Sequence, residues 1–133
     1  MPQEQELLLA AIGDPAPLSH PGIEARQGTL DGHEVVIAAS GVGKVNAAIT
    51  STLMVERLGC RALVLSGVAG GLSAGLAIGD IVIAEQVIDI DYGRLTPEGR
   101  IVYQPGALPI PEERPDPGYH ASEALLERVR GRL

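Results

Sequence analysis

Five glycines lie between an apolar run and an acidic residue in the stretch VLSGVAGGLSAGLAIGD, Val64 to Asp80. Glycine lets a backbone approach a ligand closely, and the absence of large side chains from Gly67 to Gly71 leaves room for a flat molecule. The glycine spacing fails the G-x-G-x-x-G pattern, which argues against a dinucleotide site. Considered alone, the stretch is compatible with a structural turn and with a ligand cradle.

A second glycine-containing segment, SGVGK at Ser40 to Lys44, invites comparison with the phosphate-binding P-loop. That motif needs a glycine five residues before its Gly-Lys pair and a Ser or Thr after it. Ala38 and Val45 occupy those two positions here. We therefore interpret the segment as a tight strand-to-helix turn with amide groups open at the start of the helix.

Several carboxylates are candidates for chemistry. Glu4 lies near the start of the first expected helix, where an acidic residue ordinarily just favours the helix dipole. Asp80 follows a glycine and is placed to cap a local turn. Asp89 and Asp91 lie two residues apart at a strand end and so share a face. No histidine neighbours them and the three histidines show no ligand spacing, so we predict no metal site and no cofactor.

Composition limits the partners of the chain. It has 133 residues, 45% of them hydrophobic and 20% charged, as expected of one globular domain. The net charge of −7 argues against nucleic-acid binding. The arginines 128, 130 and 132 are interpreted as a solvated last helical turn.

The single cysteine, Cys60, permits no intrachain disulfide, and we interpret it as a small buried side chain rather than a nucleophile. The N-terminal residues lack the basic and apolar regions of a signal peptide. No apolar run reaches the 18 or so residues that cross a bilayer. We expect a soluble, cytoplasmic chain that does not contact a membrane.

Apolar periodicity and turn residues predict the elements that hold these groups. The expected order is a helix over 3–12, a loop over 13–22, a hairpin over 23–40 with its turn at Asp31-Gly32, a loop over 40–43, a largely buried helix over 44–58, buried parallel-type strands over 61–67 and 79–90, a Pro- and Gly-rich functional loop over 91–118, and a helix over 120–131 starting near Ser122.

Strands that alternate with a long helix predict βαβ units and a mixed sheet. Such sheets bind ligands at the carboxyl ends of their strands. The glycine stretch directly follows the expected strand at residues 62–66, which is the place where a ligand site is expected.

In order and spacing, the segments MPQEQELL, SGVGKVNAA, LVLSGVAGGLSAGLAIGDIVIAEQVIDIDYG and PGALPIP resemble the nucleoside phosphorylase and nucleosidase superfamily. The closest resemblance is to the bacterial 5'-methylthioadenosine/S-adenosylhomocysteine nucleosidases, and it covers nearly the whole chain. It implies an α/β fold, specifically a three-layer α/β/α sandwich around a mixed sheet. It also implies hydrolysis of the N-glycosidic bond between ribose and a purine.

The resemblance carries roles onto individual residues. Met1 to Glu4 match the family's Met-x-x-Glu context, so Glu4 inherits the water-activating role and Met1 a place in substrate binding. Glu6 is the rival if the alignment slips by two residues. A carboxylate suits this chemistry because the transition state is cationic at the sugar.

Other residues are expected to bind the substrate. Val68, Ala69 and Gly70 fall on the segment that lies under base and ribose in the family, and Val42 falls on the sugar side. Phosphorylases of the hexameric bacterial type carry a phosphate-binding Arg where this chain has Leu65, and a Ser at Val68. We expect Leu65 to be buried, and since a leucine cannot neutralise phosphate, water is favoured as the nucleophile.

The resemblance also implies a homodimer in which a loop reaches the neighbouring site, and Tyr103, Pro105 and Pro109 fall on that loop. A Pro-rich surface connector is the alternative for this segment. The small-molecule partner implied is a nucleoside, and the 5' substituent that it carries is left open.

The chain departs from the family at both ends. The family has a strand before the Met-x-x-Glu helix, and a second half with a base-stacking Phe, a Met-Glu pair that grips ribose and an Asp that protonates the leaving base. This chain has no Phe. We therefore expect residues 1–133 to form a partial domain that lacks the first strand and the C-terminal half, with Met1 internal to a longer reading frame.

Such a piece is expected to be poorly stable and inactive as a nucleosidase by itself. Two alternatives to the nucleosidase stay open: a phosphorylase of the same superfamily, and a non-catalytic remnant that binds nucleosides.

Overall fold

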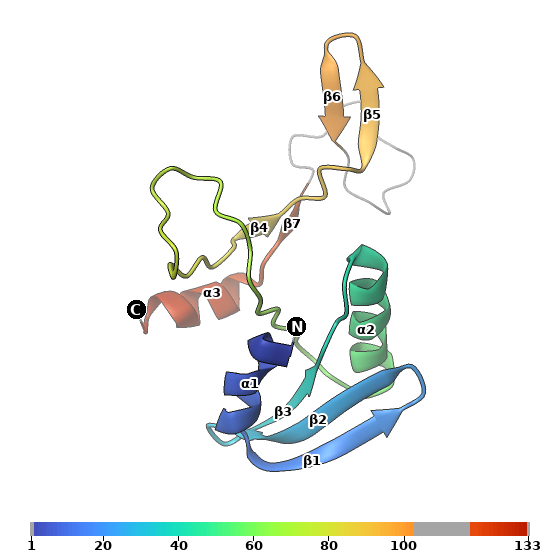
Figure 1. Cartoon of the computed structure of the whole chain (residues 1–133), viewed down its shortest axis with the longest axis vertical. Coiled ribbons are helices and arrows are strands. Elements are labelled where there is room, and N and C mark those ends of the chain that lie inside the picture. The colour runs from blue at the N-terminus through green and yellow to red at the C-terminus, as the bar shows by residue number, and fades with distance from the viewer. Residues whose placement is uncertain (1, 103–117, 133) are drawn as a thin grey trace. The chain divides into compact units, whose positions relative to one another are not determined.

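The computed structural model describes residues 2–102 and 118–132 (Figure 1). The chain divides into two compact units, Met1–Leu72 and Ser73–Leu133. Among the described residues, the first unit has three strands and two helices, and the second unit has four short strands and one helix. The described strands of each unit pair only in antiparallel fashion. The mixed sheet expected from the sequence is therefore not present among the described strands.

The first unit opens with helix α1, Pro2–Ala11, and continues into a three-stranded sheet. Its strands follow chain order: β1 Gly13–His20, β2 Ile23–Leu30 and β3 His33–Ala38 (Figure 1). Asp31 and Gly32 both adopt positive φ, 50° and 77°, as a two-residue type I′ turn requires. The predicted first helix and the hairpin over 23–40 are confirmed.

Strand β1 replaces the loop predicted over 13–22, so that prediction is wrong. Pro15 and Pro17 lie within β1, but β1 is at the edge of the sheet, where a missing N–H is tolerated. The pairing of β1 with β2 is also irregular between Gly13 and Ala16, and Asp14 there has φ 51°. An irregular edge strand therefore accommodates residues that a regular interior strand would not.

Helix α2, Lys44–Glu56, confirms the predicted helix but not its burial. None of its residues is buried, and Val45 is 74% exposed. An apolar helix becomes buried only when other elements cover it, and the described part of this unit leaves the side chains of α2 half-buried at most. The burial of α2 was predicted from its apolar composition, but composition does not show which elements pack over the helix.

The strands predicted over 61–67 and 79–90 are wrong for this chain, except for β4 at Gln86–Val87. Leu65 is 88% exposed rather than buried, and Ile81 is equally exposed at 88%. Interior strands of a sheet depend on hydrogen-bonded neighbours on both sides, and no described strand pairs with residues 61–67 or 79–85. Without such neighbours these apolar runs have no regular secondary structure and remain largely exposed.

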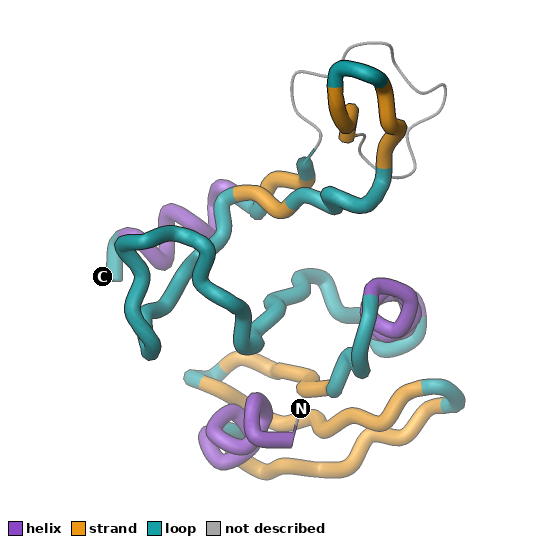
Figure 2. The backbone as a smooth tube through the Cα atoms, turned by 45° about the horizontal axis from the view of Figure 1, so that its top comes forward, coloured by secondary structure: helices purple, strands orange, loops and turns teal. Residues whose placement is uncertain are grey.

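In the second unit, β4 pairs with β7, Tyr119–His120, and β5, Gly93–Thr96, pairs with β6, Gly99–Val102 (Figure 2). The β5–β6 hairpin lies in a region predicted to have no regular structure. Residues 103–117 fall outside the described residues, and so do the predicted partner-subunit positions Tyr103, Pro105 and Pro109.

Helix α3, Glu123–Arg130, begins after Ser122 as predicted. It is amphipathic, with Leu126 buried. At the C-terminal end of α3, the Arg130 guanidinium donates hydrogen bonds to the carboxylates of Glu85 and Glu123. The exposed ion pair with Glu85 links the helix to the segment before β4. Its exposure agrees with the interpretation of the C-terminal arginines as part of a solvated helix.

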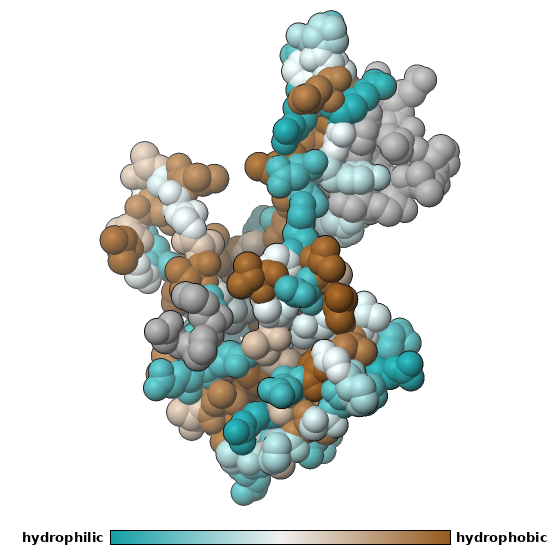
Figure 3. All heavy atoms as spheres, turned by 45° about the vertical axis from the view of Figure 1, so that its right-hand side comes forward, coloured by the Kyte–Doolittle hydropathy of each residue, from teal (hydrophilic) through white to brown (hydrophobic). Residues whose placement is uncertain are grey.

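Little apolar surface is buried. Among the described residues the buried hydrophobic side chains are Ile12, Ile23, Ala25 and Leu126. Large hydrophobic side chains are exposed in both units, among them Val64 at 85% and Ile81 at 88%. Brown hydrophobic side chains are accordingly visible on the surface in Figure 3. No helix within the described residues has the length and apolarity needed to cross a membrane.

Candidate functional site

The first turn of α1 carries Glu4, and the glycine stretch carries Val68, 64 residues further along the same unit. The Val68 N–H donates a hydrogen bond to Glu4 Oε1, with an N···O distance of 3.1 Å. The contact is made by the main chain, so it does not depend on the valine side chain. The structure thus brings the expected water-activating carboxylate against the segment expected to lie beneath a nucleoside.

The electrostatic surroundings of Glu4 favour its ionised form. Hydrogen bonding to the positive amino terminus, and next to the Val68 N–H, lowers the pKa of the Glu4 carboxyl from its ordinary value. Desolvation acts in the opposite direction but is outweighed. At neutral pH the group is therefore a carboxylate, the form that can orient a water molecule and stabilise a neighbouring cation.

The rival residue, Glu6, lies two positions further along α1 and its side chain is exposed. Positions two apart on a helix point to different sides of it. Since the contact with the glycine stretch is made by Glu4, the geometry favours Glu4 over Glu6 as the carboxylate of this site.

The glycine stretch presents an open surface beyond Val68. Val68 is 85% exposed, and Ala69 and Gly70 are exposed as well. A Cβ atom added at Gly70 would meet no heavy atom within 4 Å. This surface has space for a flat ligand, and no described side chain fills it.

Val42 lies in the turn before α2 and is 89% exposed. Its carbonyl accepts a hydrogen bond of 2.7 Å from Asn46 Nδ2, and Gly41 and Gly43 flank it with φ of 73° and 91°. These features confirm the strand-to-helix turn predicted for SGVGK. Met1, expected to contact substrate, is not among the described residues.

The aspartates of the second unit make local contacts. Asp80 Oδ2 accepts a 2.8 Å hydrogen bond from the Ala77 N–H, which confirms its predicted local capping role. Asp89 Oδ1 accepts a 3.1 Å bond from the Asp91 N–H. In the described part of the chain, no group of three His, Cys, Asp or Glu side chains could hold a metal ion. Cys60 is half-buried rather than fully buried.

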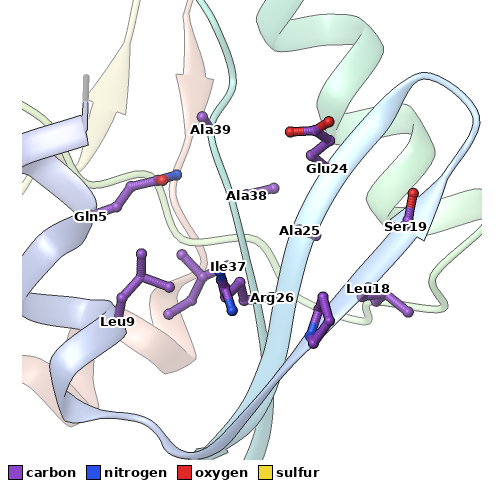
Figure 4. Close-up of a pocket in the computed structure, with 11 residues that line it drawn as sticks. Gln5, Leu9, Leu18, Ser19, Glu24, Ala25, Arg26, Ile37, Ala38 and Ala39 are labelled. Carbon is purple, nitrogen blue, oxygen red and sulfur yellow. The ribbon is translucent and has the colours of Figure 1, made fainter.

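A hollow of about 420 Å³, which the sequence did not predict, lies in the first unit between α1 and the sheet (Figure 4). Gln5 and Leu9 line it from α1, and residues 17–19, 24–26 and 37–39 line it from the three strands. Glu4 and Val68 are not among its lining residues. We place the candidate site at the Glu4–Val68 contact, because that contact joins an ionised carboxylate to the exposed, glycine-containing stretch.

Known proteins match the chain over most or all of its length. The profile of the phosphorylase superfamily matches residues 1–132. A 5'-methylthioadenosine/S-adenosylhomocysteine nucleosidase of Mycobacterium tuberculosis is 45% identical over 133 residues, which are 100% of this chain and 52% of the relative. The corresponding nucleosidase of Aeromonas salmonicida is 38% identical over 112 residues, 82% of this chain and 49% of the relative.

Solved structures give the same result. The 5'-methylthioadenosine/S-adenosylhomocysteine nucleosidase of Neisseria meningitidis, in complex with methylthio-immucillin-A, matches with a TM-score of 0.79 and 31% identity over 98% of this chain and 53% of its own. The corresponding nucleosidase of Streptococcus pneumoniae, with the transition-state inhibitor MT-ImmA, matches with a TM-score of 0.83 and 27% identity. That match covers 100% of this chain and 54% of the solved chain. The chain therefore spans about half the length of the relatives and structures that it matches.

Proposed function

The chain belongs to the phosphorylase superfamily, and from this membership we propose that it supplies the water-activating half of a purine nucleosidase site. The substrates proposed are 5'-methylthioadenosine, S-adenosylhomocysteine and nucleosides of that type. The observation that carries the proposal is the 3.1 Å hydrogen bond between the Val68 N–H and Glu4 Oε1. It unites the two groups that the hydrolysis needs on this side of the sugar.

In the reaction proposed, the bond between the ribose carbon and the purine nitrogen breaks and the sugar becomes cationic. Glu4 orients a water molecule and accepts its proton as the water oxygen bonds to that carbon. The negative carboxylate also stabilises the sugar cation. Val68, Ala69 and Gly70 support base and ribose, Val42 borders the sugar side, and Met1 adds to substrate binding.

The departing purine carries away the bonding electrons and needs a proton. The resemblance assigns that proton to an Asp of the family's second half, and the chain spans 52% of the Mycobacterium tuberculosis relative. We therefore propose that residues 1–133 form a partial domain that binds nucleoside without efficient turnover until the remaining half is supplied.

The proposal extends to fold and assembly. In the complete domain, residues 61–67 and 79–90 are proposed to become strands of a mixed sheet within a three-layer α/β/α sandwich. Their large exposed side chains support this, because an apolar run of that kind is ordinarily covered on both faces. The complete protein is proposed to be a cytoplasmic homodimer of methionine salvage, with residues 103–109 reaching the neighbouring site.

A phosphorylase of the same superfamily is less well supported. Leu65 and Val68 stand where the hexameric phosphorylases have their phosphate-binding Arg and Ser, and neither side chain can neutralise phosphate. Water is accordingly the proposed nucleophile.

The test is to replace the matched 133-residue stretch of the Mycobacterium tuberculosis relative with this chain and to measure adenine release from methylthioadenosine. We expect release by the spliced enzyme in phosphate-free buffer, unchanged when phosphate is added. Release that requires phosphate would support the phosphorylase instead. Nucleoside binding without release by a spliced protein that melts cooperatively would support the non-catalytic alternative.

A further inference from the structure

We propose that Gly67 is a positioning residue whose missing side chain lets the glycine stretch hold the Glu4 carboxylate. The role of Glu4 as the base rests on the proposed function. The placement of its carboxylate by Gly67 rests on the geometry of the first unit alone.

The first observation is a close approach. A Cβ atom added at Gly67 would lie 3.3 Å from Glu4 Oε1. This separation is tighter than nine in ten contacts that real Cβ atoms make, so the carboxylate must shift by a few tenths of an ångström. The same oxygen accepts the hydrogen bond of 3.1 Å from the next residue, Val68. A methyl group at position 67 must therefore displace the very oxygen that the neighbouring N–H binds.

The second observation is that the backbone conformation of Gly67 does not itself require glycine. Gly67 is not among the glycines with positive φ, so an alanine can adopt its backbone conformation. Substitution by alanine therefore tests the contact with Glu4 rather than a strained turn. The hydrogen bond is 3.1 Å long, near the upper end of the usual range of about 2.7–3.2 Å, so a shift of the oxygen by a few tenths of an ångström can lengthen it beyond that range.

The third observation supplies a control in the same glycine-rich stretch. Gly75 also lacks positive φ, and a Cβ added there would have its nearest contact at 3.9 Å, with Ser73 Oγ. That distance is ordinary van der Waals contact. Gly75→Ala therefore makes the same chemical change without approaching a carboxylate.

The consequence concerns the acidity of the base. Donation from the Val68 N–H is one of the interactions that lower the pKa of Glu4. If alanine at position 67 moves the carboxylate away from Val68, the pKa of Glu4 rises, although the hydrogen bond to the amino terminus, the larger of the two contributions, still lowers it. The amide of Val68, no longer bonded to a titrating group, then ceases to report that titration.

The experiment is a pH titration of the full 133-residue chain, from pH about 3 to 7, followed through the amide resonances of Val68 in two-dimensional NMR spectra. Glu4→Gln identifies the part of the Val68 shift that comes from Glu4. Amides of the β2–β3 ladder report whether the first unit is folded in each variant.

We expect the Val68 amide to titrate with Glu4 in the unmodified chain and in Gly75→Ala. In Gly67→Ala we expect it to lose most of that shift while the ladder resonances stay in place. A full shift in Gly67→Ala with an intact ladder would overturn the proposal. Collapse of the ladder in Gly67→Ala alone would also overturn it, because the glycine would then serve the fold rather than the carboxylate.

Absence of any Glu4-dependent shift at Val68 in the unmodified chain would likewise overturn the positioning role. None of these measurements involves turnover. The expected titrations together with a spliced enzyme that fails to release adenine would therefore leave the positioning role standing and refute the proposed function.

Discussion

Ile12 anchors the end of α1 to the sheet, so its truncation should loosen the helix that carries Glu4. Its side chain is only 5% exposed. It covers Gly28 in β2: a Cβ added at Gly28 would lie 3.2 Å from Ile12 Cδ1. We expect Ile12→Ala to destabilise the first unit through lost burial and the small cavity left behind.

The size of the effect follows from the packing. Truncation of a buried isoleucine to alanine costs about 2–5 kcal/mol in well-packed cores. Buried hydrophobic residues described in this unit are Ile12, Ile23 and Ala25, so the surroundings can collapse easily and the low end, about 2 kcal/mol, applies. At about 1.4 kcal/mol per tenfold change, that loss corresponds to roughly a 30-fold change in the unfolding equilibrium.

The assay is amide hydrogen exchange in the β2–β3 ladder, for example at the pairs Gln27–Val36 and Thr29–Glu34. We expect exchange there to accelerate by roughly 30-fold in Ile12→Ala. The matched control is Leu7→Ala on α1, where the side chain is 82% exposed and the expected change is within about 0.5 kcal/mol. Equal exchange rates in Ile12→Ala and the unmodified chain would refute the reasoning.

Two further predictions concern the chain by itself. The pKa of Glu4 is lowered in the folded state, so the stabilisation from its contacts is present above the unfolded pKa and is lost as the pH falls through the lowered folded pKa. Thermal unfolding curves should therefore show a loss of stability on acidification that Glu4→Gln lacks. Identical pH dependence of the two proteins would count against this prediction. Large hydrophobic side chains of the described residues are exposed, among them Leu65, Leu72 and Ile81. We therefore expect a broad, weakly cooperative melt and binding of a hydrophobic dye. A sharp calorimetric transition without dye binding would contradict this.

Local chemistry made part of the fold predictable. The Asp31-Gly32 pair specifies a two-residue turn and hence the β2–β3 hairpin. The helix boundaries at Lys44 and Ser122 follow from the preceding glycine turn and from a favoured capping residue, although the Ser122 side chain makes no capping hydrogen bond. These features depend on a few adjacent residues, which is why the sequence alone reveals them.

Features that depend on distant partners were not predictable in the same way. The apolar run at residues 61–67 has strand composition, yet strand formation requires neighbours that no pattern within the run supplies. The burial expected for α2 and Leu65 failed for the same reason. The edge strand β1 was missed because its prolines are tolerated only at a sheet edge, a position that local sequence does not reveal.

The candidate site shows the same division. The glycine pattern indicated an open backbone surface but left a turn and a ligand cradle equally possible. Only the family resemblance connected that surface with Glu4, and the structure supplied the hydrogen bond between them. The close approach of Gly67 to the carboxylate was not visible in the spacing of the glycines, because it depends on where α1 lies.

The central claim, that Glu4 activates the water, is tested most directly by Glu4→Gln in the spliced enzyme. Removal of a positioned general base should lower the rate of adenine release by about 10²–10⁴-fold, whereas Glu6→Gln should leave the rate nearly unchanged. Circular dichroism and substrate-analogue binding should match between the two variants. Adenine release by Glu4→Gln at the rate of the unmodified spliced enzyme, or a comparable loss in Glu6→Gln alone, would contradict the account.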